Sequence, residues 1–215
     1  MYLSCDKNLS LITMNLFDLA YIKSKKLKSI RKYHIESEGL IIDRKIISKV
    51  VEPRKIKIIF LSRLIVSKGL DTFLDLVNYS KSVSPSIEFT IIGNGSDSVI
   101  KKISNLSKKL PNLNFFTKLD EKEKVRILIE ASHIFCLTRY SEGAPMNLLE
   151  GQIYGCIPLV YENSISSECT APVFFKFLIN DKSTIEEIHN TIISSYMEWS
   201  CSNYKKAFSY LKDNH

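Results

Sequence analysis

The feature that most constrains this chain is the alternation of two hydrophobic periods between residues 56 and 161. Short apolar runs rich in β-branched residues lie at residues 56–62, 87–93, 112–116, 133–138 and 157–161. Segments with the period of an amphipathic helix lie between them, at residues 70–83, 97–109, 120–132 and 145–155. This alternation indicates right-handed βαβ units, and near-continuous apolar strands are typical of sheets covered on both sides. We therefore expect an α/β fold, a Rossmann-like parallel sheet with helices on both faces.

The two ends of the chain are less regular. Toward the C-terminus, residues 173–180 predict one more strand, and residues 183–199 and 201–213 predict helices. Near the N-terminus, residues 9–17 suit a strand, and residues 21–33 suit a basic helix with Tyr21, Leu27 and Ile30 facing inward. The first 50 or so residues are too few for a doubly wound domain. They would be the trailing part of another domain, or a cap.

The composition is that of a globular, soluble protein. Of the 215 residues, 45% are hydrophobic and 25% are charged, and no apolar run approaches the roughly 20 residues of a membrane span. The five cysteines include no C-x-x-C pair and the four histidines do not cluster, so neither a disulfide framework nor a metal site is expected. Cys136 and Cys156 would be small buried hydrophobes, and reduced thiols fit a cytoplasmic protein.

The net charge of +7 comes from one segment. Residues 21–57 hold 12 Lys and Arg against 4 Asp and Glu, whereas the rest of the chain holds 18 against 19. Few aromatic residues accompany this basic segment and no helix-turn-helix or zinc pattern is present, so we expect no nucleic-acid partner. Two interpretations stay open for the segment: a solvated helix and linker, or peripheral contact with an anionic membrane surface.

Polar and flexible residues gather where the expected strands end, which is where open parallel sheets bind ligands. Arg63, Lys68 and Gly69 follow the first of these strands, and Gly93-Asn94-Gly95 follows the second. Residues 139–145 lead from another strand directly into a helix, whose free N–H groups favour phosphate. Glu142 and Glu150 could accept hydrogen bonds from hydroxyl groups. Each feature alone suits a surface charge or a turn, but together they indicate a nucleotide-like ligand.

Three of these segments resemble motifs of the glycosyltransferase family 4 retaining enzymes. Ser62-Arg63-Leu64 with Lys68-Gly69-Leu70-Asp71 is similar to the "GRL…KG-x-D" segment, and residues 89–95 are similar to the "l-x-i-x-G-x-G" turn. The stretch SEGAPMNLLEGQIYGCIPLV at residues 141–160 resembles "S-x-x-E-G-x-P-x-x-L-L-E-A-x-A-x-G-x-P-V-I", with both glutamates at the family spacing. The resemblance covers about residues 35–161 and keeps the order of the three motifs.

The resemblance implies the C-terminal, donor-binding domain of a GT-B glycosyltransferase. Residues 51–215 would form this domain, and residues 1–50 would be a remnant of the N-terminal acceptor domain with its linker. Arg63 and Lys68 would hold the diphosphate of a nucleotide sugar and Glu142 the transferred sugar, these three being the implied catalytic residues. The ribose would bind Glu150. Further contacts with the nucleotide-sugar donor would come from other residues of the second and third motifs: Gly93, Gly95, Gly143, Ala144, Pro145 and Met146.

The implied activity is transfer of a sugar, with retention and without a metal or other cofactor, to a glycan or lipid-linked acceptor. Such enzymes serve polysaccharide or lipopolysaccharide biosynthesis, in the cytoplasm or at the inner membrane face. The chain departs from the pattern in several places: Ser62 replaces a glycine, Gly151 an alanine, and YENSISSECT the expected "G-G-x-x-E". Two alternatives stay open. A separate chain could supply the N-terminal half, or the protein could be an inactive relic that acts as a binding or interaction module.

Overall fold

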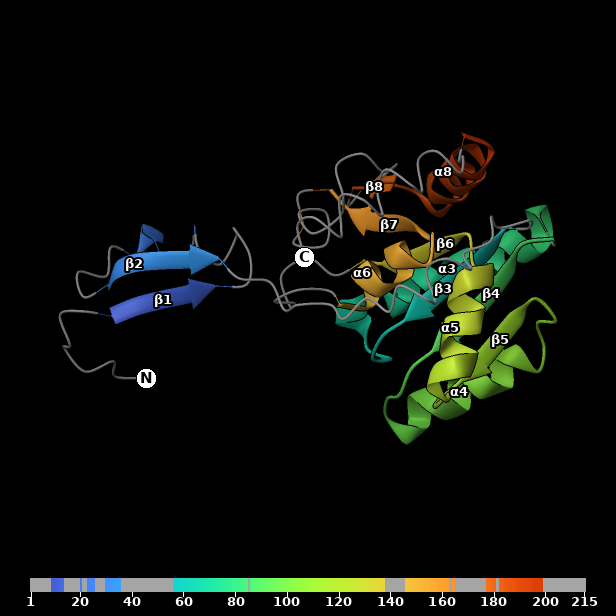
Figure 1. The fold of residues 1–215 in the computed structure, drawn as a ribbon. Coiled ribbons are helices and arrows are strands. Elements are labelled where there is room, and N and C mark those ends of the chain that lie inside the picture. The colour runs from blue at the N-terminus through green and yellow to red at the C-terminus, as the bar shows by residue number, and fades with distance from the viewer. Residues whose placement is uncertain are drawn as a thin grey trace.

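The structure is a computed structural model, and the residues that it describes are 9–13, 20, 23–25, 30–35, 56–84, 86–137, 146–162, 164, 177–180 and 182–198. Within them, six strands form one sheet in the order β5-β4-β3-β6-β7-β8, and every neighbouring pair is parallel (Figure 1). The strands are β3 Lys57–Leu61, β4 Glu88–Ile92, β5 Leu113–Phe116, β6 His133–Cys136, β7 Ile157–Tyr161 and β8 Phe177–Ile179.

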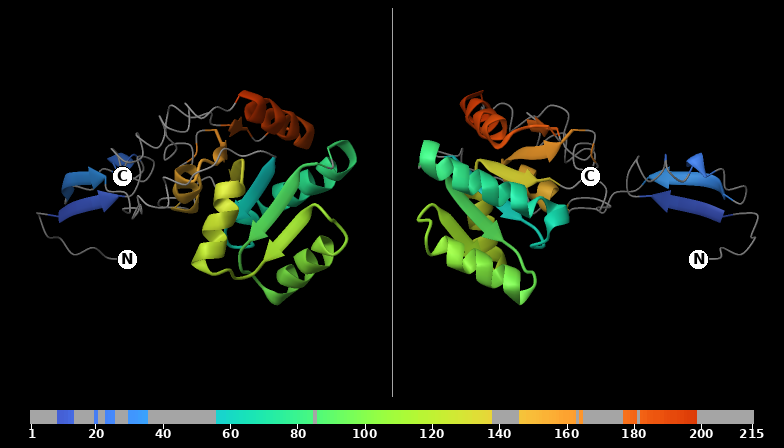
Figure 2. Two further views of the ribbon diagram at one scale, coloured as in Figure 1. Left: turned by 45° about the vertical axis from the view of Figure 1, so that its right-hand side comes forward. Right: turned by 180° about the vertical axis from the view of Figure 1, so that it is seen from behind.

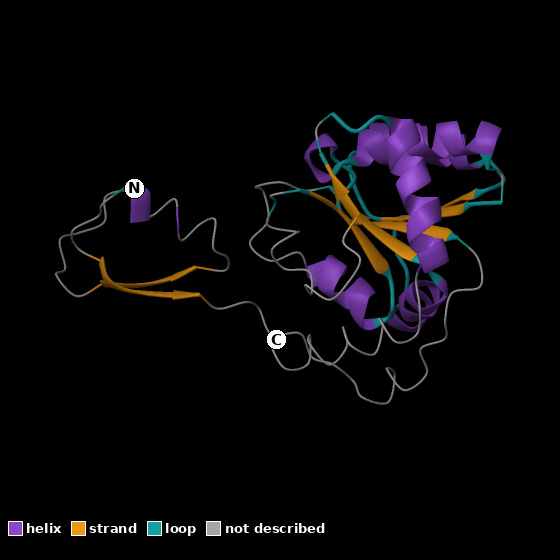
Figure 3. Cartoon of the chain, turned by 90° about the horizontal axis from the view of Figure 1, so that it is seen from above, coloured by secondary structure: helices purple, strands orange, loops and turns teal. Residues whose placement is uncertain are grey.

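Helices cover both faces of this sheet, as Figure 3 shows from above. One face carries α3 (Leu70–Val83), which follows the short 3-10 helix η1 (Val66–Lys68), together with α4 (Asp97–Ser107) and α8 (Ile185–Glu198). The other face carries α5 (Glu121–Glu130) and α6 (Met146–Ile153). The predicted α/β class, with a Rossmann-like parallel sheet between two helical layers, is confirmed.

The helix faces that pack on the sheet are those that the apolar periodicity predicts. In α3, the residues Leu70, Phe73, Leu74 and Val77 are all buried. Phe73 lies at the centre of an aromatic cluster, with ring centroids 5.4 Å from Phe60, 5.7 Å from Phe89 and 5.0 Å from Phe135. The core under α5 and α6 has no such cluster among its buried residues, which are Ile59, Ile92, Leu128, Ala131, Ile134, Leu148, Cys156 and Val160.

The N-terminal segment corrects one prediction. β1 (Leu9–Thr13) lies in the predicted strand and pairs in parallel with β2 (Ile30–Ile35), in a two-stranded sheet separate from the larger one (Figure 2). The helix predicted at residues 21–33 is wrong over its last four residues, which belong to β2. Pairing with β1 there overrides a weak helical period, because β-branched and aromatic side chains such as Ile30 and Tyr33 also suit a strand.

Toward the C-terminus, the strand predicted at residues 173–180 corresponds to the three-residue β8, and the helix predicted at 183–199 corresponds to α8. The helix predicted at residues 201–213 lies outside the described residues. Among the helices that the structure does describe, none combines the length and the apolar character needed to cross a membrane.

Candidate functional site

The strand order places a switch point between β3 and β6. From β3 the chain passes through α3 to β4, which lies on one side of β3 in the sheet. From β6 it passes through α6 to β7, which lies in the opposite direction along the sheet, and α6 covers the face opposite to that of α3. At such a point the connections leave the carboxyl ends of the two strands in different directions, and a crevice opens between them. The segments that the sequence motifs occupy begin at these strand ends.

Direct contacts hold the rim segments of the crevice together. The side-chain amide of Asn147, in the first turn of α6, donates to the carbonyl of Leu61 at the end of β3 over 2.8 Å. The loop after β3 also meets the loop after β4, because the backbone N–H of Leu64 donates to the carbonyl of Asn94 over 2.9 Å. Three segments that are far apart in the sequence therefore form one rim.

Two glycines make this close assembly possible. A Cβ atom on Gly93 would lie 1.9 Å from the carbonyl oxygen of Ser62, so no larger residue fits between the two loops. Gly69 has a φ of +80°, in the left-handed region, and a Cβ atom there would lie 2.6 Å from the Cβ of Leu137, just beyond β6. The glycines of the first two motifs thus serve the packing of the rim itself.

The predicted rim cations differ in their exposure. Arg63 is exposed, whereas Lys68, at the end of η1, is only 2% exposed. Lysine is rarely buried to this extent, so Lys68 is more than the surface charge that its sequence context also allowed. Of the two, Lys68 therefore offers the more strongly desolvated charge.

The other predicted site residues divide into two groups. Gly95 packs on Leu64, since a Cβ atom there would lie 2.9 Å from the Leu64 Cβ, and Met146 is the first residue of α6. The remaining residues of the last motif lie outside the described residues; they are Glu142, Gly143, Ala144 and Pro145. Their roles stay predictions.

Glu150 is a half-buried residue on α6 with a partner on α5. Its Oε1 lies 2.8 Å from the Nζ of Lys124, and the two side chains are 19% and 24% exposed. Glu121 adds a second carboxylate to Lys124, at 3.1 Å. Burial lowers the pKa of Lys124, but the hydrogen bonds and charges of Glu150 and Glu121 outweigh it and hold that pKa above its ordinary value. Lys124 is therefore charged across the physiological range.

Asn147 and Lys124 are the residues that sequence reasoning missed. Asn147 directly follows Met146, but nothing in its type shows that it bonds back to β3. Lys124 stands among the charges of Glu121-Lys122-Glu123-Lys124, and the helical period alone does not distinguish it from the exposed Lys122. Only the position of α6 beside α5 identifies the lysine that meets Glu150.

Away from the rim, His133 has a structural role. It is fully buried at the start of β6, where its ring nitrogens lie 2.8 Å from the hydroxyls of Ser132 and Ser195. Burial lowers the pKa of His133 to about 3, so the ring is neutral. Cys156 is a buried free thiol, as predicted, and burial followed by the charge of Glu150 raises its pKa.

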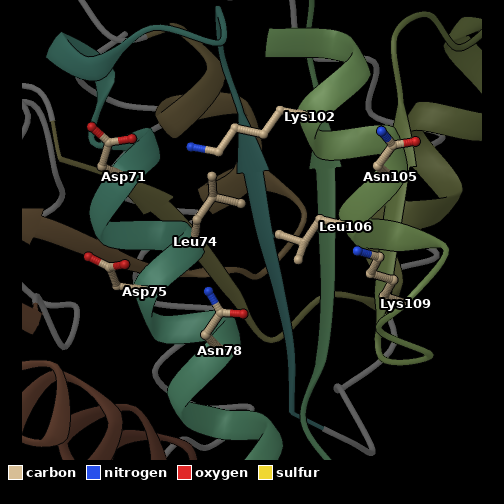
Figure 4. Close-up of a pocket in the computed structure, with 8 residues that line it drawn as sticks. All are labelled: Asp71, Leu74, Asp75, Asn78, Lys102, Asn105, Leu106 and Lys109. Atoms are coloured by element: carbon tan, nitrogen blue, oxygen red, sulfur yellow. The ribbon is translucent and has the colours of Figure 1, made fainter. Parts of the chain in front are cut away.

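A surface groove of about 490 Å³ lies between α3 and α4, outside the crevice (Figure 4). Asp71 and Asp75 line it from α3, Lys102 lines it from α4, and Lys109 lines it from the turn after α4. Opposite charges therefore face each other over a small apolar floor. No group of His, Cys, Asp and Glu side chains suited to a metal ion occurs among the described residues, in this groove or elsewhere.

Comparison with known proteins identifies the family. The profile of the family Glycosyl transferases group 1 matches residues 42–209, which is most of the chain. The fold is that of a glycosyltransferase domain of the GT-B superfamily. The chain belongs to the group 1 glycosyl transferases. Among curated protein sequences, no significant match was found.

Solved structures share the fold at low sequence identity. The pneumococcal O-GlcNAc transferase GtfA, in complex with UDP and GlcNAc, matches with a TM-score of 0.71 and 15% identity, over 95% of this chain and 42% of its own. Anabaena Alr3699/HepE, in complex with UDP and glucose, matches with a TM-score of 0.70 and 12% identity, over 94% and 58%. WaaG, a glycosyltransferase involved in lipopolysaccharide biosynthesis, matches with a TM-score of 0.70 and 15% identity, over 94% and 58%. The chain thus spans about half the length of these structures.

Proposed function

We propose that this chain binds a nucleotide sugar in the crevice between β3 and β6 and supplies the donor half of a family 4 glycosyltransferase. The observation that carries the proposal is the joining of the loops after β3 and β4 to the first turn of α6, through Leu61, Asn147 and the contact of Ser62 with Gly93. Those segments hold the motifs that resemble donor-binding motifs, and their chemistry suits a diphosphate flanked by two sugars.

In this proposal, Lys68 and Arg63 hold the diphosphate. A desolvated ammonium interacts more strongly with an anion than an exposed one, because less water screens the charge. Lys68 therefore carries the larger share, and Arg63 adds a fork for the phosphate oxygens from the exposed side. Gly93 and Gly95 keep the loop after β4 close to the loop that carries both cations.

The segment before α6 completes the donor site. The backbone N–H groups of Gly143, Ala144 and Met146 would donate hydrogen bonds to the phosphates. The helix dipole of α6 would favour the negative charge of the phosphates at the same place. Glu142 would accept hydrogen bonds from the hydroxyls of the transferred sugar, and Glu150 from those of the ribose.

The proposed reaction breaks the bond between the sugar C1 and the phosphate oxygen, and its electron pair leaves with the diphosphate. An acceptor hydroxyl oxygen forms the new bond to C1 on the same face, and its proton passes to the departing phosphate oxygen. Lys68 and Arg63 stabilise the negative charge on the diphosphate as it departs. No metal is needed for this step, and retention is a part of the proposal that anomeric analysis of the product would test.

In this proposal, the acceptor binds outside the crevice. We propose that residues 51–215 form the donor domain and that residues 1–50 belong to the boundary with an acceptor-binding half, in the same protein or in a separate chain. The acceptor would be a glycan or a lipid-linked saccharide, as in polysaccharide or lipopolysaccharide biosynthesis. The site of action would be the cytoplasm, with the basic segment at residues 21–57 in contact with the inner membrane face.

Calorimetric titration of the chain with UDP, GDP, ADP and their common sugar conjugates tests the proposal. We expect binding of at least one, unchanged by EDTA, and a loss of roughly tenfold or more in affinity for Lys68→Met, because a charge-assisted phosphate contact is removed. Arg63→Ala should reduce the affinity by a smaller factor than Lys68→Met. Asp75→Asn, in the groove between α3 and α4, is the matched control that leaves affinity unchanged.

The two alternatives from the sequence give different outcomes. Binding accompanied by slow hydrolysis or transfer of the donor sugar supports an enzyme, whereas binding without turnover, alone or with an acceptor-binding chain, supports a binding module. No affinity for any nucleotide or nucleotide sugar would contradict both the enzyme and the nucleotide-binding module, and would leave the relic that acts as an interaction module.

A further inference from the structure

The ion pair between Lys124 and Glu150 joins α5 to α6 at the sheet face opposite α3. Lys124 is the one partner that the described part of the chain gives the carboxylate of Glu150, and it contacts Oε1 at 2.8 Å. Both side chains are less than one quarter exposed, so water screens the pair less than it screens a surface pair. The contact therefore restrains the carboxylate.

The first turn of α5 holds Lys124 in place. Asp120 caps this helix, since its side chain accepts a hydrogen bond from the backbone N–H of Glu123 over 2.8 Å. The backbone N–H of Lys124 itself donates to the Asp120 carbonyl over 3.0 Å. Leu128, one turn further, is fully buried in the core that α5 shares with α6. A capped and anchored helix turn thus sets the position from which Lys124 reaches Glu150.

This geometry has two consequences for Glu150. One oxygen, Oε1, is engaged by the ammonium, which leaves Oε2 to accept a hydrogen bond from a ligand. The positive charge of Lys124 also offsets the negative charge of Glu150, which would otherwise repel a diphosphate bound nearby. A carboxylate whose orientation is fixed and whose charge is offset by an ammonium can accept a hydrogen bond from a neutral hydroxyl group beside a phosphate.

We propose that Lys124 is a positioning residue that orients Glu150 toward a ribose hydroxyl and so makes the site selective for ribonucleotides over 2′-deoxyribonucleotides. This inference rests on the proposed function, because it assumes that a nucleotide binds beside Glu150. A site built to bond a hydroxyl loses affinity for an analogue that lacks it, since its own polar group is then left without a partner.

The same helix provides a matched control. Near the other end of α5, Glu130 pairs with Lys57 over 2.9 Å, in a contact of the same type that is more exposed. Lys57 is the first residue of β3, and the rim of the crevice lies at the other end of that strand. Removing this pair perturbs α5 without changing Glu150.

The test is calorimetric titration of the full chain with UDP and with 2′-deoxy-UDP, or with the corresponding pair of whichever nucleoside diphosphate binds tightest. For the unchanged protein, we expect about tenfold weaker binding of the deoxy analogue. In Lys124→Met the ratio should fall to within about twofold, mainly because UDP itself binds less tightly. Lys57→Met should keep the tenfold ratio, and Lys124→Arg should keep most of it, since it retains the charge.

A structural role of Lys124 would weaken both nucleotides equally, so an unchanged ratio in Lys124→Met overturns the inference while leaving the proposed function in place. The same holds if the unchanged protein binds both nucleotides equally. Absence of any nucleotide binding by the unchanged protein would remove the proposed function, and this inference with it.

Two further variants serve as a control and as a safeguard against misfolding. Glu121→Gln removes the outer carboxylate, which is 73% exposed, and leaves the Lys124–Glu150 pair intact. It should keep the ratio. If Lys124→Met unfolds, Lys124→Gln keeps a polar side chain of similar length, and its ratio supports or overturns the inference in the same way.

Discussion

The two faces of the sheet are built differently. Under α3, α4 and α8, three phenylalanine rings pack around the ring of Phe73. Under α5 and α6 the buried residues are aliphatic or small, and Gly151 lets α6 approach Ile134 closely. The face with α5 and α6 also carries the half-buried pair of Lys124 and Glu150.

This difference suggests a division of roles between the faces. The aromatic face buries more apolar area, and burial of aromatic side chains contributes strongly to folding stability. The other face presents charged groups at the crevice, and partly desolvated charges contribute little net stability. Stability should therefore depend mainly on the first face, and ligand specificity on the second.

The largest expected effect is on the aromatic face. Phe73→Ala should reduce the free energy of unfolding by about 3–5 kcal/mol, because it removes a ring that contacts three others and leaves a cavity. Leu148→Ala, equally buried under α6, should cost about 2–3 kcal/mol. Urea unfolding followed by circular dichroism measures both, and Phe73→Leu gives a milder change if the alanine variant does not fold. Equal or reversed losses would contradict the proposed division.

On the aromatic side, the buried His133 makes the stability of the fold depend on pH. The pKa of His133 is about 3 in the folded protein, against about 6.5 when unfolded, so the unfolded chain takes up the proton first as pH falls. Stability is then lost below pH 6.5, by about 1.4 kcal/mol between pH 7.5 and pH 5.5. His133→Gln should remove this slope.

The measurement is the difference in unfolding free energy between the unchanged protein and His133→Gln at several pH values. Subtraction cancels the titration of other groups, and the nearby Tyr196 does not interfere because burial raises its pKa further from this range. A difference that does not vary with pH would show that the pKa of His133 in the folded state is close to its unfolded value.

A smaller effect is expected at the contact of α6 with the sheet. In Gly151→Ala the new Cβ would lie 2.6 Å from the Cδ1 of Ile134, so the isoleucine must shift. Overpacking lowers the free energy of unfolding, whereas the gain in helix propensity raises it. We expect a net loss of about 1 kcal/mol in the free energy of unfolding. Adding Ile134→Val should restore most of it, as a double-mutant cycle would measure. Additive losses would show that the two residues do not compete for space.

The smallest effect is expected for the exposed pair of Lys57 and Glu130. The hydrogen bond from Lys57 lowers the pKa of Glu130, an effect that burial opposes and that the charges of Lys57 and Arg126 reinforce. Its stabilisation is therefore present above about pH 4.5 and is lost as pH falls through the lowered pKa. Because the Glu130 side chain is 44% exposed, Glu130→Gln should cost less than about 1 kcal/mol at pH 7. A larger cost in thermal melts would contradict this weak role.

Much of the fold was predictable because the strands and helices of the larger sheet have clean periods. The face of α3 follows from the spacing of Leu70, Phe73 and Val77, and the α/β class follows from the alternation itself. Residues 30–33 were predicted wrongly because a short segment such as Ile30–Tyr33 suits both a helix and a strand. Only its pairing with β1 decides between them.

The candidate site was predictable only in part. Motif spacing indicated which rim residues belong together, including Lys68 and Glu150. It did not reveal that Lys68 is buried or that Glu150 has a partner on α5, because burial and partners depend on which helices become neighbours. The bond from Asn147 to Leu61 spans 86 positions in the chain and has no local signal.

The parallel pairing of β3 with β6 has a consequence for the order of folding. Ser132 and Lys57 are 75 positions apart, yet each bonds to the other at the start of these two strands. During synthesis, β3 can pair with β4 long before β6 is available, and contacts of such separation form slowly. The open edge of β3 is then free to pair with a strand of another chain. Translation pauses or chaperones that act before residue 137 is made should therefore affect the yield of this protein more than later ones.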